Sequence, residues 1–154
     1  MFNKEINLTT SSVSENTATD NPKTEGKVAI VTGGGSGIGR AACIQFAKDS
    51  IAVSVWDLDG SSAEETAAMV IAAGGRAIAC ALDASLAIDI ADALARTQRE
   101  LGPVTILLNN AATHSRLPFL EISEELWNRT MRINLAGPFL CAKAVLPGML
   151  EAGW

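Results

Sequence analysis

The stretch VAIVTGGGSGIGRAACIQFA, residues 28–47, places the strongest constraint on how this chain can fold. Its first four residues are apolar and mostly β-branched, which is typical of a strand covered on both faces. Five glycines follow within seven positions, and from Ile38 onward apolar residues recur close to a helical period. A strand that passes through glycines into a helix exposes backbone N–H groups and the positive end of the helix dipole. The stretch therefore predicts a phosphate-binding turn, against the alternative of a glycine-rich surface turn without a ligand.

The composition excludes several classes of protein. Of the 154 residues, 48% are hydrophobic and 19% are charged, which suits a folded α/β domain. The formal net charge is −5 and the basic residues form no cluster, so nucleic acid is not an expected partner. We find no apolar run of the length needed to span a bilayer, so no membrane partner is expected.

The cysteines indicate the redox environment. Cys43, Cys80 and Cys141 are odd in number, far apart and set among apolar residues. This pattern predicts buried free thiols rather than a disulfide or metal framework. Free thiols are typical of a reducing compartment, and we therefore expect a cytoplasmic protein.

Residues 1–25 differ in kind from the rest of the chain. They are rich in Ser, Thr and Asn and show no periodicity, which predicts a flexible polar tail. The segment lacks the apolar stretch of a secretory signal, and its acidic residues argue against an organelle transit peptide. We expect the folded part to begin at about residue 26.

Strands and helices alternate along the remaining chain. After the first strand, β-prone apolar segments lie at residues 51–56, 76–81 and 104–108, with helical patterns between them. This alternation predicts right-handed βαβ units and a parallel sheet with helices on both faces. We expect a Rossmann-like three-layer α/β/α fold with strand order 3-2-1-4. Its ligand crevice should lie between strands 1 and 4, at their carboxyl ends.

Serine side chains stand where several helices should begin. The expected caps are Ser61 or Ser62 for the second helix, Ser85 for the third and Ser123 for the fourth. The last helix is expected over residues 139–152, with a kink at Pro147.

A carboxylate, Asp57, closes the second strand eighteen residues beyond Gly39. At this place in a Rossmann fold, an acidic side chain accepts hydrogen bonds from the adenosine ribose hydroxyls of NAD, and its charge repels the 2′-phosphate of NADP. Neither Ser36 nor Leu58 supplies a basic side chain that would offset this charge. We therefore expect NAD rather than NADP. The alternative is that Asp57 is a solvated loop residue, with Asp59 as a nearby competitor for its role.

Three motifs follow one another along the chain. They are Thr32-Gly33-x-x-x-Gly37-x-Gly39, Asn109-Asn110-Ala111-Ala112 and Ile133-Asn134-Leu135-Ala136-Gly137. Together they resemble the glycine motif, the N-N-A-G segment and the V-N-L-x-G segment of the short-chain dehydrogenase/reductase family. The resemblance implies a partial NAD(P)-binding Rossmann domain over residues 26–154, truncated before its fifth strand. It also implies hydride transfer between a nicotinamide and a small-molecule alcohol or carbonyl substrate.

The resemblance further implies individual roles. The implied cofactor-binding residues are Gly33, Gly35, Ser36, Gly37, Ile38, Gly39, Asp57, Asp83, Asn109 and Ala111. Asn134 is similar to the asparagine that helps to hold the family's catalytic lysine through a water. From the residues alone, a purely structural role of Asn134 in bending a helix is an equal alternative.

The residues that would complete the family's chemistry are missing from the sequence. In the family a tyrosine transfers the proton, a lysine lowers the pKa of that tyrosine and a serine orients the substrate. This sequence contains no tyrosine, and Phe139 stands four residues before Lys143. We expect the cofactor-binding half of an oxidoreductase, inactive alone. The alternatives are a non-catalytic nucleotide-binding or regulatory module and, more distantly, a Rossmann-like methyltransferase. Because the last helix resembles one that family members use for pairing, a homo-oligomer is one option.

His114 and Ser115 stand in the loop that should border a substrate. Residues adjacent in sequence rarely point into hydrogen-bond register, and no third, orienting group can be named for them. We therefore favour a surface or substrate-contact role for this pair over a catalytic one.

Overall fold

The computed structural model describes residue 24 and residues 26–153. Apart from Thr24, the expected polar tail over residues 1–25 lies outside the described residues. The first strand of the described residues is β1 (Val28–Thr32).

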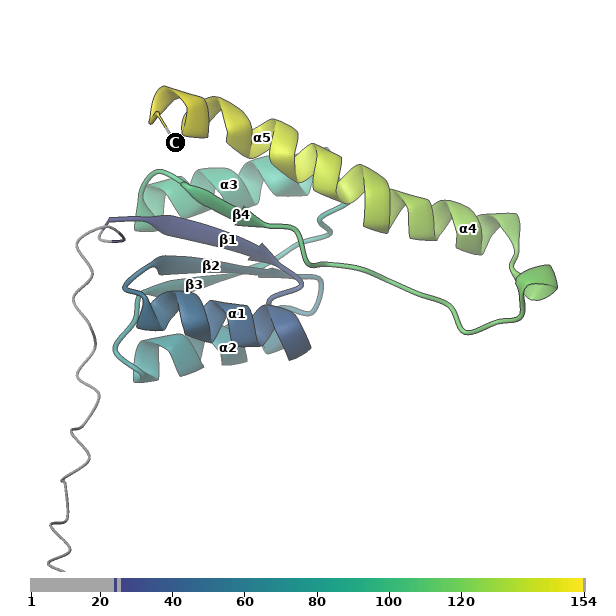
Figure 1. The fold of residues 1–154 in the computed structure, drawn as a ribbon, viewed down its shortest axis with the longest axis horizontal. Coiled ribbons are helices and arrows are strands. Elements are labelled where there is room, and N and C mark those ends of the chain that lie inside the picture. The colour runs from purple at the N-terminus through teal and green to yellow at the C-terminus, as the bar shows by residue number, and fades with distance from the viewer. Residues whose placement is uncertain (1–23, 25, 154) are drawn as a thin grey trace, which may run out of the picture.

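A parallel sheet forms the centre of the molecule (Figure 1). It contains β1, β2 (Ala52–Asp57), β3 (Ala77–Ala81) and β4 (Ile106–Leu108), in the order β3-β2-β1-β4. The central strand β1 pairs with β2 on one side and β4 on the other, both in parallel register. Its residues are all buried, as the apolar run predicted. The expected strand order is confirmed.

Helices cover both faces of this sheet (Figure 1). The helices α1 (Gly37–Lys48) and α2 (Gly60–Ala72) lie on one face, and α3 (Ala87–Leu101) and α5 (Gly137–Glu151) lie on the other. Alternate residues of β2 enter two separate cores: Val53 and Val55 pack toward α1 and α2, while Ala52 and Trp56 pack toward α3 and α5. This arrangement confirms the Rossmann-like three-layer fold.

Polar side chains in the core beneath α3 form hydrogen bonds with one another. The indole Nε1–H of Trp56 donates to Ser54 Oγ at 2.9 Å, and Ser54 Oγ lies 2.7 Å from Thr97 Oγ1 of α3. All three residues are fully buried. Buried polar groups without partners are costly, so this network lets two hydroxyls and an indole remain in an otherwise apolar layer.

The structure corrects two of the expected helix caps. Asp59, and neither Ser61 nor Ser62, caps α2: its carboxylate accepts from the backbone N–H groups of both serines. The third helix begins at Ala87 with Leu86 as its N-cap and has no side-chain cap, because the Ser85 hydroxyl donates to Asp83 instead. The fourth cap is confirmed.

The C-terminal helices join into one. The helix α4 (Glu124–Met131) begins at its cap Ser123, whose Oγ accepts from Leu126 N–H, and is preceded by the short 3₁₀ helix η1 (Phe119–Glu121). It continues through a π-helical turn, η2 (Arg132–Ala136), directly into α5. The last helix thus starts earlier than expected, at Gly137, and runs through Pro147 to Glu151.

This continuous helix is long and apolar enough to cross a membrane, which was not expected from the sequence. Within the described residues, Glu124–Glu151 is the one helix long and apolar enough to cross a membrane, with a mean hydropathy of 1.4 over an 18-residue window. The expectation of no such segment did not foresee that α4, η2 and α5 would join. By length and composition alone, one such helix is weak support for a membrane span.

Candidate functional site

The glycine turn between β1 and α1 leaves no room for side chains at two positions. Gly33 has φ +64°, and a Cβ there would lie 2.9 Å from the Cα of Ala111. A Cβ on Gly39 would collide with the carbonyl oxygen of Gly33 and with the amide of Asn110. These glycines allow the turn, the first helical residues and the loop after β4 to approach closely.

The first turn of α1 is open to an anion. Ser36 occupies the N-cap in an extended conformation, but its side chain makes no capping hydrogen bond, and the turn contains no acidic residue. The N–H groups at the start of a helix have no intrahelical acceptor, and the dipole there favours negative charge. This corner therefore has the properties of a phosphate site.

The loop after β4 is bonded to the end of β1. Thr32 Oγ1 accepts from the backbone N–H groups of Asn110 and Ala111, each at 3.0 Å. In return, the Asn110 side-chain amide donates to the carbonyl oxygens of Thr32 at 3.0 Å and Gly33 at 3.1 Å. These bonds hold the two halves of the crevice at a fixed distance.

Asp57 faces this crevice, and Asp59 does not. The Asp57 carboxylate accepts from Gly35 N–H at 2.8 Å and from Asp59 N–H at 3.0 Å. Asp59 is the cap of α2, and hydrogen bonds from the Ser61 and Ser62 hydroxyls and backbone lower its pKa from 3.8 to about 2. Asp59, the alternative to Asp57 for the ribose contact, thus has a structural role as the cap of α2.

A cavity of about 530 Å³ lies at the carboxyl ends of the strands and collects most of the predicted residues. The predicted residues that line it are Gly33, Ser36, Gly37, Ile38, Asp57, Asp83, Asn109 and Ala111. Gly35 and Gly39 shape the turn behind it without lining it. Residues that the sequence analysis did not select also line it, among them Leu82, Arg129, Arg132, Ile133 and Cys141. For Ile133 the signal was its place next to Asn134; the others carry no motif.

Asp83, after β3, contributes a second carboxylate to the cavity. Its oxygen accepts from the hydroxyl of Ser85 at 2.7 Å and from the backbone N–H of Ser85 at 2.9 Å. The Ser85 hydroxyl, helped by the positive charges of Arg132 and Arg129, lowers the pKa of Asp83. Asp83 is therefore a charged acceptor at neutral pH.

Asn134 lies outside the cavity lining and ties a loop to the long helix. Its side-chain carbonyl accepts from Thr113 N–H at 2.8 Å, and its amide donates to Thr113 C=O at 2.8 Å. Asn134 stands inside the π-helical turn η2. The side chain therefore bonds to the loop after β4 rather than to its own helix.

His114 and Ser115 are both exposed, and neither lines the cavity. Ser115 Oγ accepts from Leu117 N–H at 3.1 Å, which stabilises the loop. The geometry agrees with the surface role that we favoured for this pair.

The three cysteines are free and buried, as predicted. Burial raises the pKa of the Cys43 thiol to about 12 and that of Cys141 to about 11. Such thiols stay protonated and unreactive at neutral pH. Cys141 therefore lines the cavity as a buried, protonated thiol that donates to the carbonyl oxygen of Ala84.

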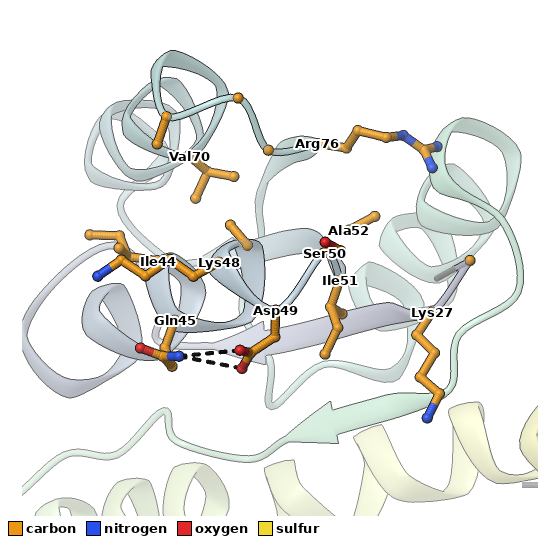
Figure 2. A pocket seen from close by; sticks show the side chains of 15 residues that line it. Lys27, Ile44, Gln45, Lys48, Asp49, Ser50, Ile51, Ala52, Val70 and Arg76 are labelled. Carbon is orange, nitrogen blue, oxygen red and sulfur yellow. Dashed lines mark hydrogen bonds between the residues drawn. The ribbon is translucent and has the colours of Figure 1, made fainter. Parts of the chain in front are cut away.

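A larger cavity, of about 730 Å³, lies at the opposite end of the sheet, and Figure 2 shows it from close by. Its basic side chains, Lys27, Lys48 and Arg76, extend in different directions and do not converge on a common point (Figure 2). Arg76 donates to the carbonyl oxygen of Leu101 at the end of α3. Volume alone therefore does not make this cavity the functional site.

Comparison with known proteins identifies the family. The family model described as "short chain dehydrogenase" matches residues 27–154. The chain belongs to the short chain dehydrogenase family. The family match covers β1, the glycine turn and every element that lines the 530 Å³ cavity.

Two proteins named as dehydrogenases are similar to this chain. D-threitol dehydrogenase of Mycolicibacterium smegmatis is 40% identical over 132 residues, which are 84% of this chain and 50% of that protein. Human 17-beta-hydroxysteroid dehydrogenase 13 is 36% identical over 126 residues, or 82% of this chain and 42% of that protein. The chain thus spans about half the length of these relatives.

A solved structure shows the same likeness in three dimensions. A crystal structure from Burkholderia xenovorans, titled as a short-chain dehydrogenase/reductase, superposes with a TM-score of 0.79 at 34% identity. The match covers 85% of this chain and 54% of that one. The four-stranded parallel sheet and its flanking helices are therefore the family's fold.

Proposed function

We propose that this chain binds NAD in the 530 Å³ cavity and forms the cofactor-binding half of an oxidoreductase. When bound, NAD would accept or donate the hydride exchanged with an alcohol or carbonyl group of a small molecule. The observation that carries the proposal is the junction of three features at one corner: a closely packed glycine turn, a helix N-terminus without a side-chain cap and the Asp57 carboxylate.

The residues present fit such a dinucleotide. The backbone of Gly33, Ser36, Gly37 and Ile38 would hold the diphosphate, because these residues line the cavity at the start of α1, where N–H groups have no intrahelical acceptor. Asp57 would accept the ribose hydroxyls, and Asp83 would accept from the amino group of the adenine. Asn109 and Ala111 would line the nicotinamide half. Gly35 and Gly39 would act indirectly, by shaping the turn.

The preference for NAD over NADP rests on charge. Asp57 lies beside the turn, where an adenosine 2′-phosphate would bring two negative groups together in a partly buried space. Leu58 and Ser36, the neighbouring lining residues, carry no positive charge. A 2′-hydroxyl, by contrast, can donate a hydrogen bond to this carboxylate.

Proton transfer would need a residue that the family supplies outside the matched half. A family-type mechanism needs a phenol, and the 154 residues contain no tyrosine. We propose that the chain alone binds cofactor without turnover, and that Asn134 supports the site by holding the loop at Thr113. We also propose that the full protein acts on a small-molecule alcohol or carbonyl compound, that it can form a homo-oligomer and that it is located in the cytoplasm.

A second candidate is a non-catalytic nucleotide-binding or regulatory module. The nucleotide sequence downstream of codon 154 separates the two. A continuing frame that encodes a serine and Tyr-x-x-x-Lys supports the oxidoreductase, whereas a stop codon supports the module.

Titration of the purified chain with NADH tests the binding site. Buried Trp56 lies at the cavity, so bound NADH should quench tryptophan emission by energy transfer. We expect saturable quenching that ADP-ribose reverses, and weaker binding of NADPH. A folded chain that shows no quenching and no displacement would contradict the proposed function.

A further inference from the structure

Gly35, in the middle of the glycine turn, is held from both sides by charged groups. Its N–H donates to Asp57 Oδ2 at 2.8 Å. Its carbonyl oxygen accepts from the Arg40 guanidinium, through Nε at 3.0 Å and also through Nη2. One residue of the turn therefore connects the carboxylate at the end of β2 to a cation on α1.

Arg40 is itself fixed by α2. Its Nε–H also reaches Thr66 Oγ1 at 3.0 Å, and its Nη2 forms an ion pair with Glu65. Thr66 is fully buried, and its hydroxyl proton is shared between the carbonyl oxygens of Ser62 at 3.1 Å and Gly35 at 3.3 Å. The guanidinium is planar and has donors in a rigid fork, so several simultaneous bonds leave it little freedom.

Gly35 and Asp57 are packed closely against each other. A Cβ on Gly35 would lie 2.8 Å from Asp57 Oδ2 and 2.8 Å from the Cβ of Ser62. Any movement of Gly35 toward the crevice or away from it changes the only bond from the glycine turn to the Asp57 carboxylate among those of the described residues. Arg40 is in this way connected, through Gly35, to one of the two backbone N–H groups that hold the Asp57 carboxylate; the other is that of Asp59.

We infer that Arg40 is a positioning residue that, through Gly35, fixes the Asp57 carboxylate and thereby sets the discrimination between NAD and NADP. This inference rests on the proposed function. A fixed carboxylate presents its oxygens to a 2′-hydroxyl and cannot withdraw from a 2′-phosphate. A mobile carboxylate binds the 2′-hydroxyl of NAD less well and repels the 2′-phosphate of NADP less strongly. Arg40 does not line the cavity and acts only through the turn.

The test is a pair of matched substitutions on the same helix. Arg40→Met removes the donors and keeps the aliphatic stem, and Lys48→Met removes a charge at the other end of α1, beside the distant cavity. We expect Arg40→Met to raise the Kd for NADH about tenfold and the Kd for NADPH by less than about threefold. Lys48→Met should leave both constants unchanged.

A second substitution tests the same inference if Arg40→Met does not fold. Glu65 is more exposed than Arg40, so Glu65→Ala loosens the guanidinium with less risk to the fold. Glu65→Gln keeps a hydrogen-bond acceptor for Arg40. We expect Glu65→Ala to lower the ratio of the NADPH Kd to the NADH Kd, and Glu65→Gln to restore most of it. A purely structural role would change both Kd values together, and this outcome would overturn the inference.

A measurement without cofactor separates this inference from the proposed function. The backbone amide signal of Gly35 in a ¹⁵N-labelled chain reports its bond to Asp57. We expect Arg40→Met and Glu65→Ala to shift this signal and to speed its hydrogen exchange, with Lys48→Met as the unchanged control. If the signal does not respond, the inference is wrong even when NADH binds. If it responds but the parent chain binds no NADH, the proposed function fails, and the role in discrimination fails with it.

Discussion

Thr32 and Asn110 are 78 residues apart in the sequence and bond to each other in both directions. The backbone N–H of Asn110 donates to Thr32 Oγ1, and the Asn110 side-chain amide donates to the Thr32 carbonyl oxygen, each at 3.0 Å. Because one residue ends β1 and the other follows β4, these bonds fix the width of the crevice between the two strands. The glycine turn and the loop after β4 therefore form one rigid unit.

Replacement of Asn110 should loosen this unit. Asn110→Ala removes the side-chain donor and leaves the carbonyl oxygens of Thr32 and Gly33 with fewer partners. We expect the free energy of unfolding to fall by about 1–3 kcal/mol, measured by urea denaturation. Asn109→Ala is the matched control, because exposed Asn109 makes only a 3.5 Å contact to Pro138; its effect should stay within about 0.5 kcal/mol. Equal losses in the two variants would contradict this assignment.

A methyl group on Gly39 should not be tolerated. It would collide with the carbonyl oxygen of Gly33 and with the Asn110 amide, and backbone cannot move aside cheaply. We expect Gly39→Ala to lower the free energy of unfolding by at least about 2 kcal/mol. Gly148→Ala is the control in α5, where the added Cβ would lie 3.8 Å from Gln98 Nε2; stability there should stay the same or rise by up to about 1 kcal/mol. Thermal unfolding of the two variants compares them directly.

Two aspartates two residues apart should respond in different ways. Asp57→Ser removes the carboxylate at the cavity and should raise the Kd for NADH about tenfold while it improves binding of NADPH. Asp59→Asn changes the α2 cap and should lower Tm without a change in the ratio of the two constants. Fluorescence titration with both cofactors distinguishes these results. If Asp59→Asn lost the preference for NADH over NADPH, the assignment of the ribose contact to Asp57 would be wrong.

The cap of α2 should also make stability depend on pH. The hydroxyls of Ser61 and Ser62 lower the pKa of Asp59 from 3.8 to about 2, so the folded state binds the proton less readily than the unfolded chain. The contribution of Asp59 is therefore fully present above about pH 4 and is lost as the pH falls toward 2. We expect the Tm of Asp59→Asn to approach that of the parent chain over this interval. A difference in Tm that stays constant from pH 6 to pH 2 would contradict the cap as its cause.

The loop at Thr113 should depend on Asn134. Asn134→Ala removes both bonds to the Thr113 backbone, whereas Asn134→Asp keeps the acceptor for Thr113 N–H and loses the donor to its carbonyl oxygen. We expect faster hydrogen exchange at Thr113 in both variants, with the larger increase in Asn134→Ala. Leu135→Ala, at the exposed neighbour, provides the control. Unchanged exchange in Asn134→Ala would show that the loop is held by other contacts.

Much of the fold follows from local patterns in the sequence. A buried β-branched run, five closely spaced glycines and an amphipathic helix predict β1, the turn and α1, and regular alternation of strands and helices predicts the order β3-β2-β1-β4. These features are determined locally, because strand twist and short connections leave few ways to assemble the units. For the same reason, most of the predicted cavity residues meet at one edge of the sheet.

The tertiary structure alone decided which donor meets which acceptor. Asp59, rather than Ser61 or Ser62, caps α2, and Ser85 bonds to Asp83 and not to α3. Arg40 carried no signal in the sequence, yet from the first turn of α1 it binds the carbonyl oxygen of Gly35, five residues earlier. Serine and aspartate have similar capping propensities, and their choice of partner depends on distances of a few tenths of an ångström. The partners of Asp59 and Asp83 lie two or three residues away, so several local pairings compete, and the residue pattern does not choose among them. Arg40 is oriented by Glu65 and Thr66 of α2, and this packing between two helices is contained in no local pattern.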